Sequence, residues 1–173
     1  SYAGVGELEA ASQVEVAAET SGRITRILFE SGQTVRQGQL LVQLNDAVEQ
    51  AELVRLQAQL RNADLLLGRM RKLMNLNATA RQQLDDALAE RDMALGAVRE
   101  TQAKIAQKAI RAPFSGVIGI RRVHEGQYLN AAEAVANLVD ADTLRVNFSL
   151  DEQSSAGLAP GQAVSVQVGA YPD

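Results

Sequence analysis

The 173-residue chain contains no cysteine and no tryptophan, and it has only three phenylalanines, three tyrosines and three prolines. The lack of cysteine excludes disulfide scaffolds, cysteine metal sites and thiol nucleophiles. Because large aromatic side chains usually anchor a deep core, their scarcity favours thin or elongated modules over one thick globule. The net charge of -4 offers no electrostatic case for binding nucleic acid, so we expect no nucleic-acid partner.

Long apolar runs are also missing. No stretch approaches the roughly 18 consecutive apolar residues that span a bilayer, and no signal peptide is visible. The chain begins at Ser1 rather than Met, which we interpret as a trimmed form of a longer chain, with any membrane anchor outside this sequence. No activated nucleophile, phosphate-binding loop or paired acid and base stands out, so the sequence does not predict an enzyme.

What the chain does contain is one β-pattern written twice. The stretch SGRITRILFESGQTVRQGQLLVQLND begins at Ser21, and SGVIGIRRVHEGQYLNAAEAVANLVD begins 94 residues later at Ser115, with no gap. Both copies place short β-branched runs between glycines, so both are predicted to form strands joined by tight turns. The identical positions are Ser21/Ser115, Gly22/Gly116, Ile24/Ile118, Gly32/Gly126, Gln33/Gln127, Leu44/Leu138 and Asp46/Asp140.

The segment between the copies has a helical period. It contains no proline and two glycines, and its apolar residues recur every three or four positions. This spacing predicts two helices, about 47–75 and 80–108, each on the order of 40 Å long and joined along a coiled-coil seam. The predicted seam of the first helix is Leu53, Leu56, Leu60, Ala63, Leu67, Met70 and Met74. That of the second is Leu84, Leu88, Arg91, Leu95, Val98, Gln102 and Ile105.

Capping residues mark the helix starts. Thr79 with Gln82 fits a capping box after a turn at residues 75–78, and Asp46 with Glu49 is a weaker signal of the same form. Two helices of similar length joined by a short loop lie antiparallel.

The antiparallel register puts one charged seam residue, Arg91, close to Asp64. We therefore expect these two side chains to form an ion pair. The alternative is an arginine that extends out of the seam into solvent.

After the second copy, strand patterns return at residues 144–150 and 164–168. Two strands alone are marginal in water, and we expect the segment 4–9 to complete part of this sheet.

The two copies, G-x-I-x-x-I…G-x-x-V-x-x-G-x-x-L-x-x-L and the partner from Ala112-Pro113-Phe114-Ser115-Gly116, resemble the halves of a biotinyl/lipoyl domain. With the inserted hairpin and the later strands, the chain resembles the periplasmic adaptors (membrane fusion proteins) of tripartite efflux pumps, and most closely those of RND exporters. The resemblance implies a mixed α and β, elongated, modular fold with a split biotinyl/lipoyl-like β-sandwich, an inserted antiparallel α-helical coiled-coil hairpin and part of an adjoining β-barrel domain. Its parts would be 1–11 (strand joining the barrel), 12–46 (lipoyl-like half), 47–109 (hairpin), 110–141 (second half) and 142–173 (incomplete barrel).

The function implied by this resemblance is that of a non-enzymatic adaptor without a cofactor. It would link an inner-membrane RND drug exporter to a TolC-type outer-membrane channel in the periplasm of a Gram-negative bacterium, attached to the inner membrane. Self-association as a hexameric ring is also implied. The transporter would select the exported compounds.

A tip motif of the family implies the channel contact. The family carries an Arg, a Leu four residues on and a Ser seven beyond that; here the positions hold Arg69, Leu73 and Ala80. Ala80 departs from the motif because it has no hydroxyl, so Thr79 either supplies one or that contact is absent.

Three alternatives remain at this stage. The chain could serve an ATP-driven (ABC-type) exporter, or a metal-exporting RND pump as Met70, Met74 and Met93 would suggest. It could also be a lipoyl or biotinyl carrier, but Lys72, Lys104 and Lys108 all lie in the helical segment and not on a β-turn. His124 is the only histidine, and one histidine does not make a metal site.

Overall fold

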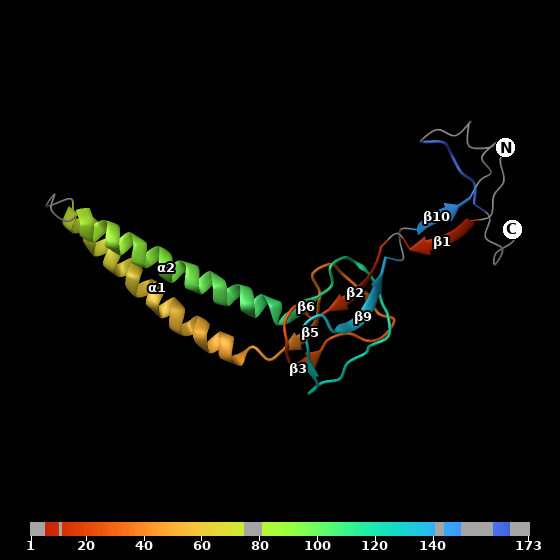
Figure 1. The fold of residues 1–173 in the computed structure, drawn as a ribbon, viewed down its shortest axis with the longest axis horizontal. Coiled ribbons are helices and arrows are strands. Elements are labelled where there is room, and N and C mark those ends of the chain that lie inside the picture. Colours follow the sequence, from red (N-terminus) through yellow and green to blue (C-terminus); the bar gives the residue numbers. More distant parts are fainter. Residues whose placement is uncertain (1–5, 11, 75–80, 141–143, 150–160, 167–173) are drawn as a thin grey trace.

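The computed structural model describes residues 6–10, 12–74, 81–140, 144–149 and 161–166. The molecule is elongated: a pair of long helices projects from one side of a β-sandwich, and a two-stranded ribbon lies on the other side (Figure 1). Within the described ranges, neither helix combines the length and apolarity needed to cross a bilayer.

The sandwich consists of two four-stranded antiparallel sheets, and each sheet takes two strands from each half of the sandwich, where a half is a copy of the repeat together with the strand that precedes it, β2 or β6. One sheet has the order β2 (Gln13–Ala17), β9 (Ala134–Val139), β7 (Gly116–Ile118), β4 (Thr34–Val35). The other has the order β6 (Ala109–Arg111), β5 (Leu40–Leu44), β3 (Gly22–Ile27), β8 (Tyr128–Leu129). The copies are therefore interleaved, and neither forms a sheet by itself.

The core has the same twofold character. Its sixteen buried residues form eight pairs, and the two members of every pair are 94 positions apart. The pairs are Val16/Ile110, Ala18/Ala112, Ile24/Ile118, Phe29/Val123, Val35/Leu129, Leu41/Val135, Val42/Ala136 and Leu44/Leu138. Because both members of each pair enter one shared core, the repeat in the sequence is a repeat of core positions.

Hydrogen bonds in the turns repeat as well. The side chain of Gln33 accepts from the backbone N–H of Glu30, and Gln127 accepts from that of His124, both at 3.0 Å. The two serines cross between copies, since Ser115 accepts from the N–H of Gln37 at 2.9 Å and Ser21 from that of Ala131 at 3.1 Å. The identical Ser and Gln residues of the repeat are therefore explained by these bonds.

Two glycines of the repeat are needed for close packing of chain segments. A Cβ atom on Gly116 would lie 2.3 Å from the carbonyl oxygen of Val139, far inside the contact distance. The equivalent Gly22 is less crowded, with the Cβ of Leu44 3.3 Å from the added atom. Any side chain at position 116 would separate β7 from β9.

The turn glycines show one exception to the repeat. Gly32 and Gly126 both have positive φ, at 83° and 84°, as expected for equivalent positions. Gly38 also has positive φ, at 79°, but its counterpart in the second copy is Ala132, with φ of 67°. Ala132 therefore holds a left-handed conformation that costs an L-residue about 1–2 kcal/mol.

The two helices are α1 (Ala47–Met74) and α2 (Arg81–Gln107), within one residue of the predicted bounds. They lie side by side along their length (Figure 1). The predicted seam of α1 is confirmed, because Leu56, Ala63 and Leu67 are buried and the remaining seam positions are half-buried.

The predicted seam of α2 is wrong at three of its seven positions. Ala87, Ala94 and Thr101 are buried, whereas the neighbouring Leu88 and Leu95 are only half-buried and Gln102 is exposed. Small alanines at the contact let two helix backbones approach closely, so the large leucines lie beside the seam rather than in it. The four positions shared with the prediction are Leu84, Arg91, Val98 and Ile105.

The start of α1 also differs from expectation. Asp46 precedes the helix, and its carboxylate accepts from the side chain of Gln50 at 3.0 Å. Glu49 does not complete a capping box among the described contacts; its carboxylate lies 3.5 Å from the ammonium of Lys108. The predicted cap at Thr79 and the turn at 75–78 lie outside the described residues.

The ribbon confirms one expected pairing and corrects another. β1 (Gly6–Ala10) pairs antiparallel with β10 (Leu144–Phe148), so the N-terminal segment does join the later strands. Of the strand expected at 164–168, residues 164–166 are described, and they have no strand structure.

Exchanging residues at the equivalent positions 38 and 132 tests the twofold geometry. We expect A132G to raise the free energy of unfolding by about 0.5 kcal/mol, because relief of the left-handed backbone exceeds the entropic cost of glycine. We expect G38A to lower it by about 1 kcal/mol, since nothing lies within 4 Å of the added Cβ and only the backbone is strained. Urea unfolding measures both, and a destabilised A132G would contradict the assignment.

Candidate docking surface on the helix pair

The far end of α1 carries the two described residues of the tip motif. Arg69 is exposed, and Leu73, one turn later on the same face, is 47% exposed. Leu66, at 37%, continues this face toward the sandwich. Thr79 and Ala80, the other two predicted site residues, lie outside the described residues. The helix thus presents an arginine between two accessible leucines.

An open depression lies beside Arg69, between the two helices. Residues of α1, among them Arg69, form one wall, and residues of α2, among them Asp86 and Glu90, form the other. The lining residues are Gln59, Asn62, Ala63, Leu66, Arg69, Met70, Gln83, Asp86, Ala87 and Glu90. A shallow groove with amides, both signs of charge and an apolar floor suits the side chains of another polypeptide better than an enclosed small molecule.

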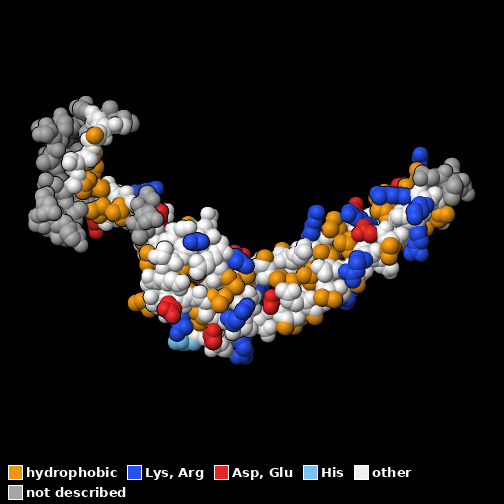
Figure 2. Space-filling view, turned by 180° about the vertical axis from the view of Figure 1, so that it is seen from behind, with side chains coloured by type: hydrophobic (Ala, Val, Ile, Leu, Met, Phe, Trp, Pro, Cys, Tyr) orange, Lys and Arg blue, Asp and Glu red, His pale blue; other side chains and the backbone are white. Residues whose placement is uncertain are grey.

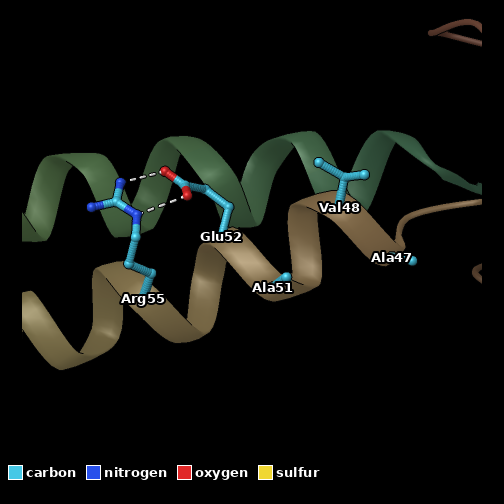
Figure 3. A pocket seen from close by; sticks show the side chains of 5 residues that line it. All are labelled: Ala47, Val48, Ala51, Glu52 and Arg55. Atoms are coloured by element: carbon cyan, nitrogen blue, oxygen red, sulfur yellow. Dashed lines mark hydrogen bonds and ion pairs between the residues drawn. The ribbon is translucent and has the colours of Figure 1, made fainter.

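A second depression lies at the base of α1 (Figure 3). It is lined by Ala47, Val48, Ala51, Glu52 and Arg55, and Val48 is 78% exposed. Arg55 donates from Nε to Glu52 at 2.9 Å and from Nη2 to the other carboxylate oxygen. The hydrogen bond from Arg55 lowers the pKa of Glu52, so this charge pair is satisfied on the helix surface and leaves no poised acid or base.

The charges at the far half of the helix pair are separated between the helices. Lys and Arg side chains gather toward that end of the molecule (Figure 2). On α1, the exposed cations Arg61, Arg69, Arg71 and Lys72 form no ion pair with any described residue. On α2, the exposed anions Asp85, Asp86 and Glu90 also form no ion pair with any described residue, and Arg81 at the start of the helix is the exception to the acidic character. Sequence analysis missed this asymmetry, although the charges could be assigned to each helix from the sequence.

The expected pair across the seam is confirmed. Arg91 donates from Nε to the carboxylate of Asp64 at 3.0 Å, and from Nη1 to Asp92 at 3.2 Å. The hydrogen bond that Arg91 donates to Asp64 is the main cause of the raised pKa of Arg91. Because both side chains are partly exposed, the pair fixes register more than it adds stability.

The lysines do not form a carrier site. Lys104 pairs with Glu100 on α2 at 2.6 Å. The Lys108 side chain is only 14% exposed and its amine is held by neighbouring groups. Lys72 is exposed, but it lies in the last turn of α1. A swinging cofactor needs a free amine at a β-turn, which none of the three provides.

Metal ligands do not converge in the described ranges, where no group of three His, Cys, Asp or Glu residues could hold an ion. Met70 and Met74 are half-buried on the seam, as core residues would be.

Comparison with known sequences agrees with these features. The family description "RND MFP, barrel-sandwich hybrid domain", in which MFP denotes membrane fusion protein, matches residues 12–141. The chain is 31% identical over 155 residues to the antibiotic efflux pump periplasmic linker protein ArpA of Pseudomonas putida, covering 88% of this chain and 41% of that protein. It is 33% identical over 147 residues to an uncharacterized protein of Haemophilus influenzae, covering 85% and 38%. The chain thus spans about two fifths of the length of these relatives.

Solved structures show the same fold. A MacA-MexA chimeric protein, which contains the α-hairpin domain of MexA from Pseudomonas aeruginosa, aligns with a TM-score of 0.78 and 26% identity, covering 88% of this chain and 56% of that chain. A membrane fusion protein of Streptococcus pneumoniae R6 aligns with a TM-score of 0.72 and 23% identity, covering 97% and 79%, and supports the fold alone.

Reversing the charges of Arg91 and Asp64 tests the seam pair. We expect R91D and D64R each to lower the melting temperature, because each variant places like charges side by side, and the double variant to recover part of the loss. Thermal unfolding followed by circular dichroism measures this coupling. The recovery should be smaller in 1 M salt, where the screening length is about 3 Å. If each substitution lowers the melting temperature equally in the native protein and in the other single variant, the two side chains do not interact.

Proposed function

The chain belongs to the family of RND membrane fusion proteins, and from this premise we propose that it forms the central part of a periplasmic adaptor. The adaptor links an inner-membrane RND exporter to a TolC-type outer-membrane channel and is anchored to, or associated with, the inner membrane. Like its family, it is not an enzyme. The observation that carries the proposal is the placement of Arg69 and Leu73, at the far end of a long helix pair that projects from the sandwich.

In this proposal each part of the chain has a mechanical task. Residues 12–46 and 110–141 form a lipoyl-like body, and the hairpin 47–109 spans the distance to the channel. Segments 1–11 and 142–173 contribute to a barrel-like domain nearer the exporter, and β1–β10 is the described part of it. The long exposed surface of the helices serves binding and not catalysis.

The channel contact is argued from the chemistry at the far end of α1. Leu73 offers an accessible apolar side chain for a notch in the channel. Arg69 has five N–H donors for carbonyl or carboxylate groups beside that notch. Thr79 and Ala80 follow in the connecting segment, where the threonine is available to replace the hydroxyl that alanine lacks.

Ring assembly is argued from the separated charges. If copies stand side by side with their tips at the same end, the basic half of α1 faces the acidic half of α2 in the next copy. Exposed Leu65 and Val54 of α1 and Met93 of α2 would then be covered. Such a contact joins two different faces, so it closes into a ring only if the rotation is right, and the family precedent is six copies.

The type of exporter is argued from the comparisons. The matching family is described for RND proteins, and the relative ArpA is named as a linker of an antibiotic efflux pump. These names favour an RND drug exporter over an ABC-type or metal exporter. The compounds themselves would be selected by the exporter.

Replacing Leu73 tests the channel contact in the complete adaptor in Gram-negative cells. We expect L73E to reduce channel capture and efflux about tenfold or more, because a carboxylate would enter an apolar notch unpaired. A photo-crosslinker in place of Arg69 should capture the outer-membrane channel when Leu73 is retained. The matched control is V48E on the same helix about 37 Å away; loss of efflux in L73E with full channel capture would refute the contact.

Reversing one charge on each helix tests the side-by-side contact. We expect K72E to weaken self-association roughly two- to fivefold, the range of an exposed ion pair, and D85K to do the same. The double variant should recover association, because the pair is restored between copies with opposite signs. Analytical ultracentrifugation of the adaptor measures this, and additive losses in the double variant would exclude the proposed alignment.

A further inference from the structure

The helix pair is connected to the sandwich at two neighbouring points. α1 follows β5, α2 precedes β6, and these two strands are paired with each other. At the junction the backbone N–H of Leu44 donates to the carbonyl of Lys108 at 2.8 Å, and the side chain of Gln43 donates to the same oxygen at 3.4 Å. These bonds hold the two strand ends together but do not by themselves set the tilt of the helices.

The side chain of Lys108 connects three separate parts of the molecule. Lys108 is the first residue after α2. Its ammonium donates to the backbone carbonyl of Ser21, in the turn before β3, at 3.0 Å. The same ammonium lies 3.5 Å from the carboxylate of Glu49 in the first turn of α1. One charged group therefore touches the sandwich and both helices.

This contact is unlike the other lysine pair on α2. The side chains of Lys108 and Glu49 are 14% and 24% exposed, whereas those of Lys104 and Glu100 are 56% and 67% exposed. The ammonium of a largely buried side chain needs partners for its charge and its N–H groups, so moving the helices away from Ser21 would leave it without one of them. The exposed pair at Lys104 carries little such cost.

Gly22 leaves the space in which the ammonium lies. A Cβ atom on Gly22 would be 3.4 Å from Nζ of Lys108 and 3.3 Å from the Cβ of Leu44. The distance to Nζ is an ordinary van der Waals contact, and the tighter contact is with Leu44. The absence of a side chain at position 22 thus leaves the ammonium packed directly against the backbone that it binds.

We propose that Lys108 is a positioning residue whose ammonium, held by Ser21 and Glu49, fixes the direction in which the helix pair leaves the sandwich. The effect at the far end is large, because a tilt of about 10° over a helix of about 40 Å moves the tip by about 7 Å. The relevance of this tilt to channel docking rests on the proposed function, whereas the role of Lys108 in setting the direction of the helix pair is independent of it.

Distance measurements between spin labels test this directly. The chain contains no cysteine, so labels can be placed at E19C on the sandwich and A89C on α2, both exposed positions in the described structure. K108M keeps the apolar stem and removes the ammonium. We expect its distance distribution to broaden or shift by several Å, on the scale of the tilt given above, while circular dichroism shows the same helix content.

Three further variants complete the experiment. K104M is the matched control and should leave the distribution unchanged. K108R should restore most of it, and E49Q, which removes the charge of the carboxylate beside the ammonium, should broaden it with the lysine still present. A native distribution in both K108M and E49Q overturns the proposal. If K108M does not fold, E49Q and K108R decide the question. Failure of channel capture in cells would count against the proposed function without touching these distances.

Discussion

The whole structure depends on one shared hydrophobic core that neither copy of the repeat can build alone. Each sheet of the sandwich needs strands from both halves, and each buried position of the sandwich core has its counterpart 94 residues away. A half with eight core side chains has too little buried surface for an independent fold. The two halves must therefore meet despite the long segment between them, which they do because β5 and β6 pair directly where that segment leaves and returns.

The helix pair has the opposite character, with a narrow interior and a large surface. Its seam is made of a few leucines and of small residues such as Ala63, Ala87 and Ala94, and it buries one stripe of each helix. Large aliphatic side chains remain accessible on the outside, among them Val54, Leu65 and Met93. Single crossings such as Arg91–Asp64 then matter for register, since small seam residues alone permit sliding.

Much of the fold could be predicted because its signals are local or repeated. The matched glycines and aliphatic residues predicted the two interlocking copies. The seven-residue period predicted both helices and the approach of Arg91 to Asp64. The choice of Leu88 and Leu95 for the seam was wrong because the period fits Ala87 and Ala94 equally well, and only the partner helix decides between them. The described part of the strand expected at 164–168 has no strand structure, because alternation shows which residues could form a strand and not whether a partner strand lies beside them.

The candidate site was less accessible to such reasoning. Arg69 and Leu73 are ordinary surface residues by spacing, and they were singled out only by resemblance to a family. The partner of Glu49 could not be found from the sequence, because Lys108 reaches it across a junction of two chain segments 59 residues apart.

The pairing of β2 with β9 is the counterpart, 94 residues shifted, of the pairing of β6 with β5. The β1–β10 ribbon consequently occupies the place in one half that the helix pair occupies in the other, and the two extend toward opposite ends (Figure 1). The sandwich thus has two equivalent attachment sites, one at each of these strand pairs. A longer or shorter segment attached at either site would change the span of the molecule while every core contact stayed the same.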